Sequence, residues 1–448
     1  MRPSRRNVLQ GVAGAGVLSA FGVPMIRHVA AADLKERYFI FCYFKGGWDL
    51  LISLDPRDPA EFRSDLRKVT RIDPGYDQLA SRYRSLVETS VPGMVYGPCI
   101  GRLADHADKT CLIRGMSMET LTHEVGRRRF ITGRAPSGLQ ARGSSAATVL
   151  ASYLGQEQAI PQLSVLVESY NSEWPSYASA IRVSSVDDLV RALGVSPNAL
   201  PAEQQAALDA MMVEVQGCKS TDRSDFYRTA LEHRSASQQL VALGLDEAFD
   251  FSANTAEMEA LRDRYGIDPE DLAAAPAQAA AAVTAITSGI SRCVSIEAAT
   301  DLDHHGPEWS SSHGPRLEAG FDLIAAMIED LESREFGNTG ESWLDRTTIL
   351  GFSEFGRTPL INSSGGRDHY LHNACFLVGG GVRGGVVLGA SSDVGMAPLA
   401  MDLATGALDE QAGEVVKPEN VFRAILTEVG ITEDAGELNA EPLTAIYG

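Results

Sequence analysis

Short, continuous runs of apolar residues recur along the chain, and each is followed by a glycine-rich or polar segment. The runs span residues 38–44, 110–114, 293–297, 347–352 and 374–378. Apolar runs of this length, without alternating polar positions, are typical of strands that are buried on both faces of a sheet. We therefore predict a central sheet that is covered by helices on both sides.

Helical periodicity appears between these runs. Apolar residues recur at three- and four-residue steps from Leu317 to Leu331, and Phe336-Gly337 then provides a stop signal. Strands that alternate with such helices predict an α/β fold with a doubly wound, mostly parallel sheet. The segment at about 196–285 is different, because it is rich in Ala, Gln and acidic residues that favour helix but has few side chains suited to chemistry. We expect it to be a helical insertion in a single α/β domain formed by residues 33–448.

The N-terminal segment does not fit this pattern. It carries the basic pair Arg5-Arg6, continues as a mildly apolar stretch rich in Gly and Ala, and closes with Ala30-Ala31-Ala32. This layout is typical of a secretory signal, and the arginine pair favours export by the twin-arginine translocase. We therefore predict that residues 1–32 are a twin-arginine signal peptide, and that the mature protein is periplasmic or otherwise exported.

Composition limits the partners of the protein. The formal net charge is −20, so neither nucleic acid nor an anionic membrane surface is expected as a partner. Beyond the N-terminal segment, no apolar run is long enough to cross a bilayer, so no stable membrane span is expected in the mature form. Six cysteines would permit disulfides in an exported protein, but four of them lie inside the apolar runs. Buried free thiols are therefore the prediction, with disulfides as the alternative.

Candidate chemistry is concentrated where the predicted strands end. In open α/β sheets, ligands bind beyond the carboxyl ends of the strands. Four polar segments occupy such positions, and they are 44–49, 301–305, 353–359 and 365–370. Their order in the chain predicts one site at a shared edge of the sheet.

The first two segments contain acids with more than one interpretation. Asp49 follows Gly46-Gly47, so it either points toward a ligand or caps a simple turn. Asp301, Asp303 and His305 alternate closely, which suits a divalent metal but also fits a solvated acidic loop.

The last two segments are similar in character. Glu354 comes at a strand end, and Arg357 three residues later either binds an anion in bidentate fashion or pairs with Glu354. Asp368-His369 follows another Gly-Gly pair, which frees the backbone to turn.

The order of these segments resembles the alkaline phosphatase and sulfatase superfamily. Ser353-Glu354-Phe355-Gly356-Arg357-Thr358-Pro359 and Gly365-Gly366-Arg367-Asp368-His369 resemble a bacterial, twin-arginine-exported branch that is catalogued as a domain of unknown function. The similarity extends from about Tyr38 to the C-terminus. It implies an alkaline phosphatase-like fold and a divalent metal cofactor, which would be zinc, manganese or calcium.

The resemblance also implies metal-binding roles. Asp49 resembles the aspartate after the first strand, and His369 resembles the last histidine of the first metal site. Asp303 or Asp301, together with His305, resembles the remaining ligands of that site. The metal-binding candidates are Asp49, Asp301, Asp303, His305, Glu354, Asp368 and His369.

The position of the nucleophile departs from the superfamily pattern. The run from His123 to Arg134 resembles the sulfatase signature, in which Cys or Ser stands nine residues before Thr-Gly-Arg, here Thr132-Gly133-Arg134. His123 takes the nucleophile position and Arg127 falls on the signature's arginine. A histidine can act as nucleophile, general base or metal ligand, but it cannot become formylglycine. Phe355 likewise replaces a histidine of the second metal site.

The leading hypothesis is an exported, metal-dependent hydrolase of phosphate or sulfate esters, acting on a small anionic substrate. His123, Arg127 and Arg357 are the catalytic candidates, and the two arginines would stabilise negative charge on the transferred group. The alternative is a catalytically silent member that serves as a periplasmic binding or assembly module, which the loss of the usual nucleophile favours. A third hypothesis is metal-dependent hydrolysis of some other bond.

Overall fold

The structure is a computed structural model that describes residues 34–195, 200–216, 240–432 and 438–447. The chain divides into two compact units, one made of the residues up to Arg182 and from Gln278 onward, the other of Val183–Ala277. The predicted signal peptide and Cys218 lie outside the described residues. Within the described ranges, no helix is long and apolar enough to cross a membrane.

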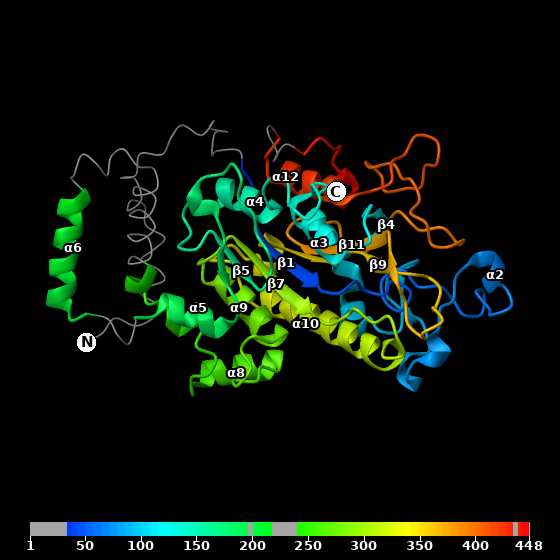
Figure 1. Ribbon diagram of the computed structural model, residues 1–448, viewed down its shortest axis with the longest axis horizontal. Coiled ribbons are helices and arrows are strands. Elements are labelled where there is room, and N and C mark those ends of the chain that lie inside the picture. The colour runs from blue at the N-terminus through cyan, green and yellow to red at the C-terminus, as the bar shows by residue number, and fades with distance from the viewer. Residues whose placement is uncertain (1–33, 196–199, 217–239, 433–437, 448) are drawn as a thin grey trace. The chain divides into compact units, whose positions relative to one another are not determined.

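An eight-stranded sheet forms the centre of the fold, in the order β12-β4-β11-β8-β1-β7-β5-β6 (Figure 1). Its strands are β1 (Tyr38–Phe44), β4 (Thr110–Ser117), β5 (Gln162–Val165), β6 (Ile181–Val183), β7 (Cys293–Ala299), β8 (Thr347–Phe352), β11 (His372–Gly379) and β12 (Val386–Leu388). β1 pairs in parallel with β7 and β8, β7 with β5, and β4 with β12. β11 runs antiparallel to both of its neighbours, β4 and β8. The predicted α/β fold with a mostly parallel sheet is confirmed.

All five predicted strands are present. The runs at 38–44 and 347–352 coincide with β1 and β8, and the other three runs are extended by a few residues in β4, β7 and β11. The antiparallel direction of β11 was not predicted, because a strand buried on both faces has the same apolar pattern in either direction. Four shorter strands form two separate two-stranded sheets: β2 (Val87–Glu88) with β3 (Val95–Tyr96), and β9 (Gly356–Arg357) with β10 (His369–Tyr370).

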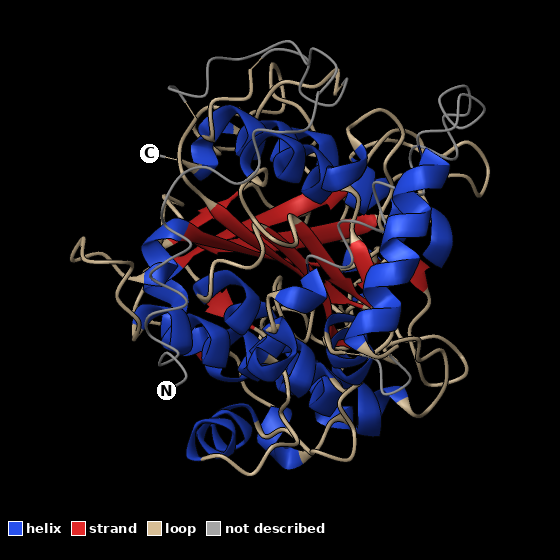
Figure 2. Cartoon of the chain, turned by 90° about the vertical axis from the view of Figure 1, so that its left-hand side faces the viewer, coloured by secondary structure: helices blue, strands red, loops and turns tan. Residues whose placement is uncertain are grey.

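Helices cover both faces of the sheet (Figure 2). On one face lie α3 (His123–Thr132), α4 (Ala146–Leu154) and α12 (Pro418–Glu428), and the ring of Phe41 from β1 packs 6.3 Å from that of Phe422 from α12. On the other face lies α10 (Gly314–Glu332), where Phe321 packs 4.8 Å from Phe44 of β1. Phe41 and Phe44 point to opposite faces because side chains alternate along a strand. Both faces of the sheet are therefore buried by helices, which explains the continuous apolar runs.

Apart from α9 (Ala275–Thr287), which begins in the second unit, the remaining described helices of this unit are short. They are α2 (Arg67–Thr70), α11 (Trp343–Arg346), a π-helical turn at Trp309–His313 before α10, and 3-10 turns at Tyr76–Gln78, Ser81–Tyr83, Gly101–Lys109, Ser176–Ala178 and Thr444–Ile446. The predicted periodicity at 317–331 falls within α10, which confirms that helix.

The second unit is helical. Its described elements include α5 (Val186–Leu193), α6 (Ala202–Gln216), a 3-10 turn at Leu245–Ala248 and α8 (Ala256–Tyr265), and α9 (Ala275–Thr287) begins in it. Ser185 and Thr255 cap α5 and α8 by accepting backbone N–H groups of the first turn. These helices are the structure that the Ala- and Glu-rich composition favours.

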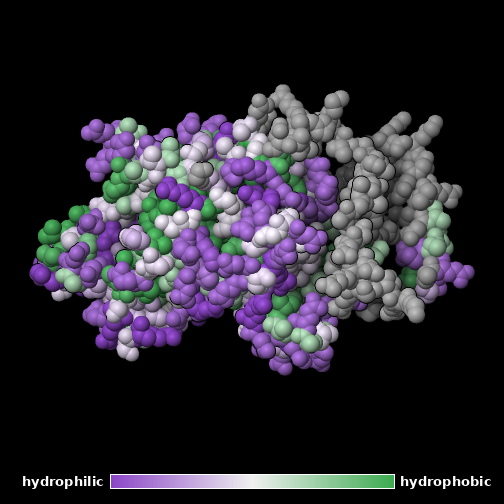
Figure 3. Space-filling model, turned by 180° about the vertical axis from the view of Figure 1, so that it is seen from behind, coloured by the Kyte–Doolittle hydropathy of each residue, from purple (hydrophilic) through white to green (hydrophobic). Residues whose placement is uncertain are grey.

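Apolar side chains are concentrated in the core. The five described cysteines are buried and unpaired: Cys42, Cys99, Cys111, Cys293 and Cys375. For all of these except Cys99, the apolar context in the sequence predicts this. Hydrophilic residues cover most of the described surface seen in Figure 3, with smaller hydrophobic groups between them.

Candidate metal centre

The polar segments gather at the edge of the sheet where its parallel strands end. β1 ends at Phe44, β7 at Ala299 and β8 at Phe352, so the segments that follow these strands meet there. β11 is antiparallel and begins at the same edge with His372. α3 follows β4 and begins with His123. The fold therefore brings segments from distant parts of the chain to one place.

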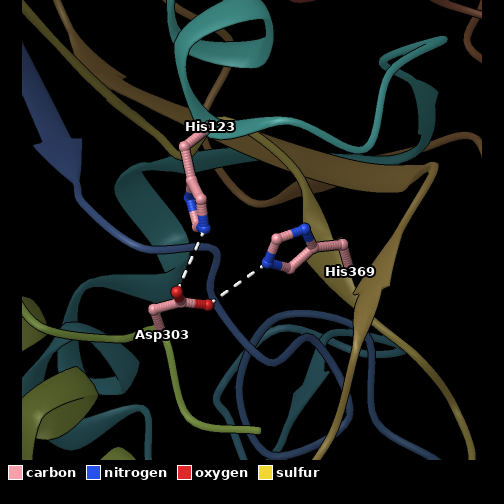
Figure 4. Close-up of side chains that lie close together, drawn as sticks. All are labelled: His123, Asp303 and His369. Atoms are coloured by element: carbon pink, nitrogen blue, oxygen red, sulfur yellow. Dashed lines mark hydrogen bonds and ion pairs between the residues drawn. The ribbon is translucent and has the colours of Figure 1, made fainter.

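Asp303 lies at the centre of this group, between three imidazoles. Its Oδ2 atom is 3.2 Å from Nε2 of His123, and its Oδ1 atom is 3.2 Å from Nε2 of His369 (Figure 4). The Nε2 atom of His305 is 3.0 Å from Oδ1 of Asp303 and 3.0 Å from Nε2 of His369. The ligand atoms of His123, Asp303 and His369 all lie within 4.8 Å of one another.

The other nitrogen of each imidazole is held by an oxygen acceptor. Nδ1 lies 2.8 Å from Glu354 in His123, 2.8 Å from Asp368 in His305, and 2.7 Å from the carbonyl of Leu121 in His369. Because carboxylates and carbonyls only accept, each neutral ring carries its proton on Nδ1 and presents a lone pair at Nε2. Histidines that bind metals almost always have such a partner on the second nitrogen.

These residues fit a divalent cation. Three Nε2 lone pairs face one carboxylate, and two of them face each other at 3.0 Å with no proton between them in the neutral rings. Lone pairs in this arrangement repel one another unless a positive charge lies between them. The Nε2 atom of His123 is also buried without a hydrogen-bond donor, which supports the same conclusion.

Electrostatics keep both key acids of the centre ionised. Burial would raise the pKa of Asp303, but the hydrogen bond and charge of Arg357 hold it well below its usual range. Burial likewise opposes ionisation of Glu354, but its hydrogen bond with His123 lowers its pKa. The same hydrogen bond raises the pKa of His123, whereas burial lowers that of His369.

Arg357 is buried next to Asp303. Its side chain is 0% exposed, and its guanidinium donates to Oδ1 of Asp303 at 2.6 Å and to the carbonyl of Gly47 at 3.0 Å. The sequence suggested that Arg357 meets a substrate anion or pairs with Glu354. Its donors point instead at Asp303, at backbone carbonyls and, at 3.4 Å, at Nε2 of His305, so its position is that of a fixed internal cation.

Asp49 is placed in a separate, closed environment. The residue is 1% exposed. Its Oδ2 atom accepts from the indole of Trp309 at 2.8 Å and forms an ion pair with Arg367 at 2.8 Å, while Oδ1 accepts from the amide of Leu51 at 3.0 Å. Asp49 therefore lies outside the group around Asp303, and both of its oxygens are already bound.

Two further candidates also form their contacts elsewhere. Asp301 is exposed and pairs with Arg316 at 2.7 Å. Arg127 lies one turn after His123 on α3 and donates to Glu168 at 3.1 Å. Burial opposes ionisation of Glu168, but hydrogen bonds from Arg128, Arg127 and Tyr170 lower the pKa of that acid to about 2.

Three partners were not predicted from the sequence. Arg367 stands inside the quoted motif at 365–369, so its position was a usable signal. Trp309 reaches Asp49 from a distant π-helical turn, and Leu121 contributes only a backbone carbonyl. A carbonyl gives no signal in the sequence, because every residue has one.

A family comparison covers nearly the whole described chain. The family described as "Protein of unknown function (DUF1501)" matches residues 36–421. The chain belongs to this family. All of the residues around Asp303 fall inside the matched span, so the candidate metal centre is part of the region that defines the DUF1501 match.

Solved structures of low similarity also match. The crystal structure of Ps i-CgsB has a TM-score of 0.39 and 10% identity, and the match covers 91% of this chain and 75% of that chain. Ps i-CgsB in complex with k-i-k-neocarrahexaose gives 0.40 and 8%, with 91% and 75% covered. A structure from glycosaminoglycan metabolism in Bacteroides thetaiotaomicron (BT33494S-sulf) gives 0.36 and 10%, with 92% and 77% covered. TM-scores this low establish no shared activity. No curated protein matches the chain.

Proposed function

We propose that the protein is an exported, metal-dependent hydrolase of phosphate or sulfate esters. The observation that carries the proposal is the convergence of three histidine Nε2 atoms on Asp303. The side chains of Asp303 and His305 are 45% and 44% exposed, so a ligand can reach them from solvent. A metal site that stays open is typical of catalysis, whereas structural sites are closed by protein ligands.

The donor set favours zinc or manganese over calcium. Imidazole suits zinc, and carboxylate and imidazole together also suit manganese, whereas calcium takes oxygen ligands. When bound, a divalent cation supplies Lewis-acid chemistry toward an ester oxygen.

The chain's own residues would hold and orient the reacting groups. Asp303, His305 and His369 would bind the cation. Glu354 would fix the ring of His123 through Nδ1, so that Nε2 faces the centre either as a further ligand or as the atom that accepts a proton from the attacking water.

The ester class rests on the sequence. The order of the polar segments resembles the alkaline phosphatase and sulfatase superfamily, and the motifs at 353–359 and 365–369 resemble a branch within it. His369 and Asp368, from the second motif, take part in the centre. This resemblance supports an anionic ester as the substrate.

The experiment compares two aspartates on the same loop. Asp303→Asn is expected to lose bound metal and to reduce the turnover of an aryl phosphate or aryl sulfate by about a hundredfold or more. Asp301→Asn, the matched control, is expected to keep both. Elemental analysis gives the metal content, and release of the aryl alcohol gives the rate. A wild-type protein that binds no zinc or manganese would contradict the proposal.

A second candidate function is a silent binding or assembly module. It is favoured by one observation: both oxygens of Asp49 and one oxygen of Asp303 are already bound by N–H donors. A wild-type protein that binds metal but turns over neither ester class would support this candidate instead.

Export is proposed from Arg5-Arg6 and the alanines that follow. Replacing Arg5-Arg6 with Lys-Lys is expected to leave the precursor in the cytoplasm, as seen by immunoblot of cell fractions. Unchanged export in a strain that lacks the twin-arginine translocase would contradict this route.

A further inference from the structure

Five of the predicted metal ligands are carboxylates, and four of them already have hydrogen-bond or ion-pair partners other than the three Nε2 atoms. The pairs are Asp49 with Arg367 and Trp309, Glu354 with His123 and the amide of Gly46, Asp368 with His305 and Asn362, and Asp301 with Arg316. Asp303 is the remaining acid, and it is the one that the three imidazoles surround. A second dication at this edge would therefore have to share Asp303 or displace an existing partner.

Arg357 already shares Asp303. Besides the 2.6 Å contact with Oδ1, the guanidinium donates from Nε to the carbonyl of Gly47 at 3.0 Å and from Nη2 to those of Leu302 at 3.2 Å and Gly46. Its Nη1 atom donates to the carbonyl of Arg367 at 3.2 Å and lies 3.4 Å from Nε2 of His305. All three nitrogens are bound and the side chain is fully buried, so the group cannot swing away. Because arginine stays protonated, it is a permanent positive charge beside the centre.

The loop after β1 is shaped around this guanidinium. Gly46 and Gly47 have φ values of +111° and +82°, where residues with a side chain are strained. A Cβ on Gly47 would lie 3.1 Å from Nε of Arg357 and 2.7 Å from the Phe355 ring, and one on Gly46 would lie 2.7 Å from the amide nitrogen of Leu302. The Gly-Gly pair therefore lets two backbone carbonyls reach the arginine.

We propose that Arg357 takes the place of a second cation, so that the centre binds a single divalent ion with a fixed guanidinium beside it. The inference rests on the metal centre of the proposed function. Its physical basis is that Arg357 occupies Oδ1 of Asp303 and repels a further dication, while the other four acids already have hydrogen-bond or ion-pair partners that a second ion would have to displace. The centre thus keeps two positive groups, of which only one is a metal.

The experiment titrates metal-free protein with Mn²⁺. Bound manganese is measured after desalting, and electron paramagnetic resonance reports whether bound ions are isolated or coupled. We expect one ion per chain with the six-line spectrum of an isolated Mn²⁺. Two ions per chain with an exchange-coupled spectrum would overturn the inference but leave the metal centre intact. No bound ion would contradict the proposed function itself.

A matched pair of variants tests the charge. Arg357→Lys keeps the positive charge and is expected to bind one ion, as the wild type does. Arg357→Met removes the charge and is expected to accept a second Mn²⁺, which raises the stoichiometry from one to two. A folded Arg357→Met that still binds one ion would overturn the role of the charge. Should Arg357→Met fail to fold by circular dichroism, the wild-type stoichiometry and spectrum decide the proposal.

Discussion

Two aspartates at the same edge of the sheet have opposite surroundings. Asp49 is buried, its oxygens accept from an indole N–H and an amide N–H, and it forms an ion pair with a guanidinium. Asp303 is partly exposed and faces three imidazole nitrogens whose protons lie on the far side of the ring. Asp49 forms an ion pair with Arg367, and Asp303 forms one with Arg357.

The difference lies in the partners and not in the acids. Around Asp49 every neighbouring group brings a hydrogen, so the carboxylate is satisfied and the arrangement is closed. Around Asp303, Arg357 brings a hydrogen but the three imidazoles bring lone pairs, so a further cation between the Nε2 atoms would stabilise the group. A carboxylate at a strand end can thus become part of the framework or part of a metal centre, and its partners decide which.

The largest expected effect is on the free energy of unfolding and concerns the ion pair of Asp49. Arg367→Met would leave the buried carboxylate of Asp49 without its counter-charge, which costs about 3–5 kcal/mol of unfolding free energy. Urea unfolding measures the loss, and manganese binding by the folded variant is expected to stay at one ion per chain. A loss below about 1 kcal/mol would show that Asp49 is not held by this pair.

The next largest effect is on metal affinity and concerns the imidazoles around Asp303. Glu354→Gln keeps an oxygen near Nδ1 of His123 but removes the buried negative charge, so metal affinity is expected to fall by about ten- to a hundredfold. Calorimetric titration with zinc gives the affinity. The control is Asp368→Asn, which changes the exposed acid behind His305 and is expected to have a smaller effect because water screens it. Equal losses in both variants would contradict a special role for the Glu354–His123 pair.

Much of the fold could be predicted from the sequence, because burial on both faces leaves a local signature. The runs that became β1 and β8 are apolar throughout, and helices on both faces require that. The direction of β11 has no such signature. Its antiparallel course decides which edge His372 reaches.

The candidate site was predictable to the extent that it depends on residue type. Asp303 and His305 were metal candidates because an acid and an imidazole alternate closely after a strand end, and His369 was one through its resemblance to a metal-binding histidine of the superfamily. The structure brings the three together. The separation of Asp49 from Asp303 was not predictable. It depends on Arg367 and Trp309, which are distant in the sequence and reach Asp49 only through the fold.

The free energy of unfolding is expected to depend on pH because His313 is buried next to Asp49. His313 is fully buried, its Nε2 atom accepts from the amide of Asp49 at 3.2 Å, and burial lowers its pKa well below the usual 6.5. The unfolded chain therefore binds a proton below about pH 6.5 that the folded protein does not, so the unfolding free energy falls as pH drops. One such proton contributes a slope of up to about 1.4 kcal/mol per pH unit.

The measurement is urea unfolding between about pH 5 and pH 7. His313→Gln keeps an acceptor for the amide of Asp49 but does not titrate. The unfolding free energy of this variant is therefore expected to change less steeply with pH than that of the wild type, by up to about 1.4 kcal/mol per pH unit, which is the slope that one proton contributes. Identical slopes would mean that His313 is protonated in the folded state as well.

The smallest expected effect concerns Asp301, which the resemblance to the superfamily offered as an alternative to Asp303. Its ion pair with Arg316 is exposed, and such pairs contribute about 0–1 kcal/mol. Its φ of +58° lies in the left-handed region, which asparagine tolerates well. Asp301→Asn is therefore expected to change the unfolding free energy by no more than about 0.5 kcal/mol, with metal affinity within about twofold of the wild type. Asp301→Val removes the same charge but places a β-branched residue at positive φ, so it should cost about 1–3 kcal/mol more. That contrast separates backbone conformation from charge. A tenfold loss of metal affinity in Asp301→Asn would show that Asp301 belongs to the metal centre, which would then contain a second exposed carboxylate beside Asp303.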